Sequence, residues 1–186
     1  MTGEQGPVVP IQRATDPIDP GVTIGHVHLR TADIARARAF YVDVLGFDVV
    51  LEGRGVMGWG ADAGRRGDFL FLAAGGYHHH LGFNTWHSAG GPPQPEGAAG
   101  LHHVAILYPA RADLADALRR LRASGWPLHQ AFDHGTHEAL YARDGDGNEV
   151  ELCWDRPFDQ WPRDDAGHIQ MQGGPLDLDA LLAALG

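Results

Sequence analysis

The chain has 186 residues and is 44% hydrophobic and 20% charged, so it carries enough apolar side chains for a substantial core and differs from a disordered segment. Its formal net charge is −10 with histidine neutral, which argues against nucleic acid or an anionic membrane as a partner, because phosphate binding needs a basic face. The single cysteine, Cys153, excludes an internal disulfide framework, and neither a signal-peptide pattern nor a membrane-length apolar run is present, so a cytoplasmic location is expected.

The first half of the chain predicts one strand, one helix and three further strands. Residues 1–21 contain four prolines and little periodicity, and we expect a loosely ordered lead-in there. The first strand is expected over 23–29, and the helix, capped by Asp33, over 34–44, with Gly46 at its end. The later strands are expected over 47–51, 69–73 and 78–85, with a Gly/Arg-rich interruption over 53–67.

The same order of elements returns in the second half. Residues 87–100 are rich in proline and glycine and are predicted to form a linker. A strand is expected over 101–107 and a helix over 111–123, where leucines and alanines recur at the spacing of one helix face. Further strands are expected over 128–132, 139–143 and 149–154, and a C-terminal extension over 158–186 with a short helix at 176–185.

This order indicates an internal repeat, and therefore an α+β fold. Two βαβββ modules, residues 22–86 and 101–157, are predicted to form curved mixed sheets around a central cleft. When His26 is superposed on His103, Val27 aligns with Val104, so both histidines take equivalent positions on equivalent strands.

Three side chains are candidate metal ligands. His26 and His103 begin equivalent strands, and Glu151 lies on the last strand of the second module. A lone strand histidine is more often a hydrogen-bonded core residue, and Glu151 alone could be an ordinary strand charge. The repeat favours ligation, because two imidazoles and one carboxylate on one face of a metal are typical of non-heme Fe(II) sites with open positions for substrate and O₂.

Several motifs resemble those of the vicinal-oxygen-chelate superfamily, which includes glyoxalases, bleomycin-resistance proteins and extradiol dioxygenases. The resemblance covers residues 22–157, and its most specific marks are the FYxxxLGF and DxDGNxxEL patterns. The stretches that carry it are Gly25–Leu29, Phe40–Phe47, His103–Ile106 and Asp144–Leu152.

Within this superfamily, three further stretches resemble the bacterial catechol 2,3-dioxygenases: Tyr77–Trp86, His134–Gly135 and Trp154–Pro157 followed by Trp161-Pro162. This resemblance implies Fe(II), with Mn(II), Zn(II) and Ni(II) as alternatives, and an aromatic diol and O₂ as substrates. The implied metal ligands are His26, His103 and Glu151.

The same resemblance implies catalytic roles beside the diol for His80, His134 and Tyr141. His80 or His134 would exchange a proton with the diol, and Tyr141 would bind one of its oxygens. The spacing from His134 to Tyr141 is shorter in this chain than in the catechol dioxygenases. His80 is further expected at the first-module position that matches Glu151.

Two other functions stay open. A glyoxalase-type lyase or isomerase has four protein ligands, the fourth from the end of a first-module strand, where we expect His80. A metal-free drug-sequestering protein of the bleomycin-resistance kind lacks the metal ligands. The oligomeric state is also open, with a homodimer or higher homo-oligomer among the alternatives because this chain has one module pair only.

Overall fold

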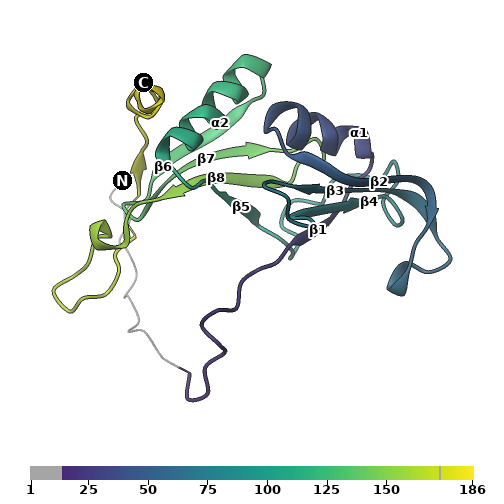
Figure 1. The fold of residues 1–186 in the computed structure, drawn as a ribbon, viewed down its shortest axis with the longest axis horizontal. Helices are drawn as coiled ribbons and strands as arrows, with labels where there is room; N and C mark the ends of the chain where they lie inside the picture. The colour runs from purple at the N-terminus through teal and green to yellow at the C-terminus, as the bar shows by residue number, and fades with distance from the viewer. Residues whose placement is uncertain (1–13, 172) are drawn as a thin grey trace.

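The computed structural model describes residues 14–171 and 173–186, and over these ranges the chain forms two mixed sheets with helices on one face (Figure 1). The first 13 residues of the predicted lead-in lie outside the described residues. The first sheet has the order β1-β4-β3-β2 and the second has the order β5-β8-β7-β6-β9. The predicted α+β class with two repeated modules is therefore confirmed.

The strands are β1 Val27–Arg30, β2 Asp48–Met57, β3 Arg66–Ala73, β4 Leu81–Asn84, β5 His103–Leu107, β6 Leu128–Asp133, β7 His137–Arg143, β8 Glu149–Asp155 and β9 Gly174–Pro175. The helical segments are α1 Ile34–Ala37, η1 Arg38–Val44, η2 Gly60–Asp62, α2 Arg111–Ser124, η3 Phe158–Gln160, α3 Leu178–Leu182 and η4 Ala183–Leu185. Within the described part of the chain, no helix is long and apolar enough to cross a membrane.

Each sheet pairs the first strand of its module in parallel with the last one. β1 pairs with β4 and β5 pairs with β8, whereas the strands between them are joined antiparallel. In the second sheet Val104, Val150 and Leu152 are buried on the side of α2, and the alternate residues lie on the other side. We call the side of the sheets that α1 and α2 leave uncovered the open face (Figure 1).

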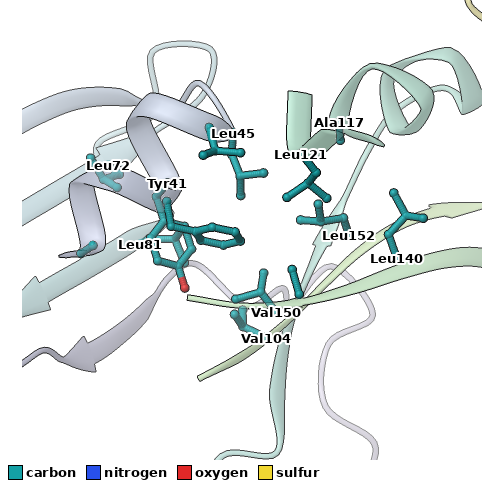
Figure 2. Close-up of a cluster of buried hydrophobic side chains, with 14 of the residues drawn as sticks. Tyr41, Leu45, Leu72, Leu81, Val104, Ala117, Leu121, Leu140, Val150 and Leu152 are labelled. Carbon is teal, nitrogen blue, oxygen red and sulfur yellow. The ribbon is translucent and has the colours of Figure 1, made fainter. Parts of the chain in front are cut away.

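One core joins the two modules beneath the helices. In Figure 2 Tyr41 and Leu45 of the first module lie in the same cluster as Leu121 and Leu152 of the second. Tyr41 is fully buried, and Leu121 and Leu152 are at most 1% exposed. Burial of such a side chain contributes about 1.5–3 kcal/mol, so this shared core holds the modules together.

The predicted helix over 34–44 is only partly α-helical. It begins as α1 with the Asp33 cap and continues as a π-helix, η1, in which Leu45 N donates to the Phe40 carbonyl. A π-helix has more residues per turn, so neighbouring side chains diverge less, and both Phe40 and Tyr41 are fully buried. The segment ends at Gly46, whose φ of 86° suits glycine.

The Gly/Arg-rich stretch 53–67 does not interrupt the strands as predicted. β2 continues to Met57 and β3 already begins at Arg66, so the two strands form a long hairpin with register shifts. A carboxylate oxygen of Asp68 accepts the Gly55 N–H at 2.8 Å, and the Val56 carbonyl accepts the Trp86 indole N–H at 3.2 Å. These side chains stabilise pairing that the local composition does not indicate.

The turn Asp144–Asn148 connects the modules. The Asp144 carboxylate is 7% exposed and accepts hydrogen bonds from the Tyr41 hydroxyl at 3.1 Å and from the backbone N–H groups of Asp146 and Asn148. At Gly145 an added Cβ would lie 2.6 Å from Cβ of Arg36, so α1 and the turn approach more closely than a side chain would allow.

Replacing Asp144 with alanine is expected to lower the free energy of unfolding by about 2–3 kcal/mol, because the buried Tyr41 hydroxyl and two partly buried backbone N–H groups lose their acceptor. Urea unfolding followed by circular dichroism measures this change. Asp159→Ala, at an exposed position, is the matched control and should change stability by less than about 0.5 kcal/mol. Equal effects of the two substitutions would show that the turn does not stabilise the fold.

Candidate metal centre

The register of the second sheet places Glu151, the candidate carboxylate ligand, and its neighbours on the open face. Glu151 in β8 lies opposite Ala105 in β5 and opposite Tyr141 in β7. His103 is two residues before Ala105, and residues two apart in a strand share a face. His103, Tyr141 and Glu151 therefore project from three adjacent strands on the same side of the sheet.

The Glu151 carboxylate is contacted at both oxygens. Its Oε2 lies 3.1 Å from His103 Nε2, and its Oε1 accepts the Tyr141 hydroxyl at 3.1 Å and lies 3.2 Å from His137 Nε2. The Glu151 side chain is only 7% exposed, so these contacts take the place of water.

The environment of Glu151 favours its charged form. Burial alone would raise the pKa of Glu151, but hydrogen bonds from His137 and Tyr141 outweigh burial and hold this pKa below its ordinary value. Burial and the nearby Glu151 charge raise the pKa of Tyr141 well above its ordinary value. At neutral pH the pair is therefore a carboxylate and a protonated phenol that donates to it.

His134 extends the chain of contacts on the far side of Tyr141. Its Nε2 lies 3.0 Å from the Tyr141 hydroxyl, and its ring stacks on His137 at 4.5 Å between centroids. Since the phenol proton is donated to Glu151, the phenol oxygen accepts from His134, which assigns the proton of this neutral ring to Nε2. Burial, followed by the charge of neighbouring His137, lowers the pKa of His134, which keeps the ring neutral near pH 7.

The structure does not place His26 and His80 in this cluster. The His26 ring lies 4.3 Å from the His79 ring and 6.2 Å from the His78 ring, beside the loop that precedes β4. His80 Nδ1 accepts the Ala74 N–H at 3.3 Å.

A cavity nevertheless links the two modules at this point. His26, His80 and His103 all line a cavity of about 530 Å³ between β1 and β5, together with Leu101 and Leu107. His26 and His80 thus border the same space as His103, although no hydrogen bond or ring contact among the described residues joins either of them to His103.

Two groups of three possible ligands have their donor atoms within 4.8 Å of one another in the described residues, and the predicted trio is not one of them. Both groups lie in the second module: His102, His103 and Glu149, and His134, His137 and Glu151. The second group contains His137, which the sequence left without a role.

The strand register corrects the expected match between His80 and Glu151. β1 and β4 pair with His28 opposite Gly82, whereas β5 and β8 pair with Ala105 opposite Glu151. With Val27 equivalent to Val104, the first-module position equivalent to Glu151 is therefore Gly82. A Cβ at Gly82 would lie 2.9 Å from His28 Nδ1, so the His28 ring occupies the space in which a side chain would stand.

Aromatic rings continue along the open face of the first sheet, away from His26. His79 stacks on Phe71 at 4.5 Å with a 12° angle between the rings. Phe71 packs against Phe69 at 5.2 Å, and Phe69 packs against Trp59 at 5.6 Å. We call these four residues, Trp59, Phe69, Phe71 and His79, the aromatic stripe.

The comparisons with known proteins agree with this fold. Residues 23–152 match the family model described as the glyoxalase/bleomycin resistance protein/dioxygenase superfamily, and the chain belongs to this superfamily. A solved structure of a glyoxylase/bleomycin resistance protein/dioxygenase domain from Frankia sp. EAN1pec superposes with a TM-score of 0.59 at 20% identity, over 73% of this chain and 98% of that one.

Two curated relatives are dioxygenases by name. The chain is 39% identical over 107 residues to catechol-2,3-dioxygenase of Bacillus subtilis (strain 168), which is 58% of this chain and 34% of that protein. It is 33% identical over 127 residues to biphenyl-2,3-diol 1,2-dioxygenase 2 of Rhodococcus globerulus, which is 68% of this chain and 60% of that protein. The chain thus spans between one third and three fifths of the length of these relatives.

The lowered pKa of Glu151 predicts an acid-dependent part of the folding stability. At a pH between the lowered folded-state pKa of Glu151 and its ordinary value of 4.5, the unfolded chain binds more protons than the folded chain. The stabilisation is therefore complete above pH 4.5 and is lost as the pH falls through the folded-state pKa. Urea unfolding of the metal-free protein between about pH 3 and pH 5 should show a shallower fall for Glu151→Gln than for the parent. The same pH dependence of the unfolding free energy in both proteins would contradict a lowered pKa of Glu151.

Proposed function

We propose that the chain is a non-heme metal-dependent extradiol dioxygenase that opens the ring of a catechol-type substrate with O₂. The single observation that carries this proposal is the contact of His103 Nε2 with Glu151 Oε2, in a cluster that also holds Tyr141 and His134. The named dioxygenase relatives support the same reaction class.

The donor geometry fits a metal ion. Two ligands bound side by side to one metal at about 2.1 Å and at right angles lie about 3.0 Å apart. The distance of 3.1 Å between His103 Nε2 and Glu151 Oε2 matches this spacing. His26 borders the same cavity as His103, and we propose it as the third ligand from the first module.

The first module favours a dioxygenase over a glyoxalase-type lyase or isomerase. The glyoxalase-type alternative takes a fourth protein ligand from the first-module strand, and the position equivalent to Glu151 there is Gly82, with the His28 ring against it. Three ligands leave neighbouring positions open for both oxygens of a diol and for O₂, which suits Fe(II). Mn(II), Zn(II) and Ni(II) are the alternative metals that the same donor atoms accept.

The residues around the ligands have separate roles in this proposal. A metal held by His26, His103 and Glu151 would supply Lewis-acid chemistry that lowers the pKa of a diol hydroxyl, so that its proton could leave near neutral pH. His134 is neutral and can take up this proton, and His80 at the cavity edge is the second candidate for proton exchange. The protonated Tyr141 phenol donates a hydrogen bond to Glu151, and its oxygen accepts one from His134.

The aromatic stripe supports a substrate with more than one ring. A catechol whose oxygens face His26 and His103 would have its substituent near Phe71 and His79, where flat apolar groups stack well. We therefore propose an aryl-substituted diol as the preferred substrate class. The alternative, a metal-free drug-binding protein, does not need the paired His103 and Glu151. The metal content of the purified protein distinguishes the two functions, because only the dioxygenase is expected to retain a metal.

The reaction is tested by loading the protein with Fe(II) without oxygen, adding catechol or 2,3-dihydroxybiphenyl with air, and following O₂ uptake and the coloured ring-opened product. His103→Ala is expected to lose the metal, whereas His134→Ala should keep it and turn over about 10²–10⁴-fold more slowly. His129→Ala, at an exposed position on β6, should behave like the parent. Failure of every diol to consume O₂, with turnover of a hemithioacetal in the Zn(II) or Ni(II) form, would favour the glyoxalase alternative.

The aromatic stripe predicts a selective effect on the larger substrate. Phe71→Leu should raise KM for 2,3-dihydroxybiphenyl about two- to tenfold and leave KM for catechol unchanged, because only the second ring reaches Phe71. Trp59→Leu, at the far end of the stripe, should change neither value. A similar rise for both diols would place the second ring elsewhere.

A further inference from the structure

His137 lies against the candidate metal centre and is held from three sides. Its side chain is 17% exposed, and its Nε2 lies 3.2 Å from Glu151 Oε1. Its ring stacks on the His134 ring at 4.5 Å, and its Nδ1 lies 2.9 Å from the Thr136 hydroxyl oxygen. A side chain held in this way has little freedom to move away from Glu151.

The Glu151 contact sets which nitrogen of His137 donates to the carboxylate. The Thr136 hydroxyl lies 2.9 Å from His137 Nδ1 and donates to the Met171 sulfur at 3.2 Å. An ionised carboxylate can only accept, so His137 Nε2, which lies 3.2 Å from Glu151 Oε1, carries a proton. His137 thus donates to Glu151 Oε1, which matches the negative charge of that carboxylate.

The two oxygens of Glu151 consequently have different surroundings. Oε1 accepts from His137 and Tyr141, whereas Oε2 is turned towards His103. The last torsion of a glutamate side chain is soft, so a carboxylate with one donor can rotate and exchange its oxygens. A second donor on Oε1 restricts this rotation and keeps Oε2 free for a metal.

We propose that His137 is a positioning residue that orients Glu151, so that the carboxylate binds the metal through Oε2 alone. This inference rests on the proposed function, because it takes His103 and Glu151 as metal ligands. It assigns to His137 no contact with the metal, although His134, His137 and Glu151 lie close enough together to form a ligand group themselves.

Co(II) binding to the metal-free protein tests this role without any turnover. Affinity is measured by competition with a chelator, and the visible spectrum of bound Co(II) reports the ligand set. His137→Leu is expected to weaken Co(II) binding about 10- to 100-fold, the usual effect of losing a residue that orients a ligand. His137→Gln, which can still donate an N–H to Oε1, should restore most of the affinity and give the parent spectrum.

The control variant and the unfolding curves separate the outcomes. His129→Leu, on the exposed side of β6, should keep the parent affinity, and thermal unfolding of the metal-free variants shows that each is folded. Parent-like affinity in His137→Leu would overturn the positioning role alone. Loss of affinity with an altered spectrum in His137→Gln would also overturn it, since His137 would then be a ligand. Co(II) affinity that does not change in His103→Ala would overturn the proposed function as well.

Discussion

The contact between His103 and Glu151 depends on the parallel pairing of β5 with β8. This pairing puts Glu151 opposite Ala105, two residues along the strand from His103, so an imidazole and a carboxylate meet on one face. Strand β8 has a neighbouring strand on each side, and its residues Val150 and Leu152 are buried against the core. Glu151 points to the opposite face and is also buried, so it has little access to water. A buried carboxylate needs hydrogen-bond partners, and the neighbouring strand β7 provides them. The polar site is therefore a consequence of sheet register.

The two modules contribute unequally to the candidate centre. The second module brings together the proposed ligands His103 and Glu151 and their hydrogen-bonded neighbours within one sheet. The first module contributes His26 at the edge of the shared cavity and the aromatic stripe beyond it. Their relative placement depends on the shared core around Tyr41 and on the turn at Asp144, which accepts the Tyr41 hydroxyl. The proposed site, divided between two sheets, needs such a connection, because a small shift of one sheet would separate His26 from His103.

The sequence predicted the repeat and its strands because hydrophobic alternation and turn residues are local signals. It did not predict the π-helix η1, which depends on burying both Phe40 and Tyr41 against the second module. The strand expected over 78–85 puts His80 at the position that matches Glu151, but β4 begins only at Leu81, and the equivalent residue, Gly82, lies two positions further along. His137 received no role because β7 was expected to begin at 139. A strand that begins at His137 puts this residue on the same face as Tyr141, so strand length was the signal that could have revealed it.

The most direct test of a metal shared by both modules is a crystal structure of the Co(II)-loaded protein with anomalous difference density. A single peak is expected, bonded to His103 Nε2, Glu151 Oε2 and the His26 ring, with His137 hydrogen-bonded to Oε1 and away from the ion. A peak held by His134 and His137, with His26 and His103 left out, would contradict a centre shared between the modules.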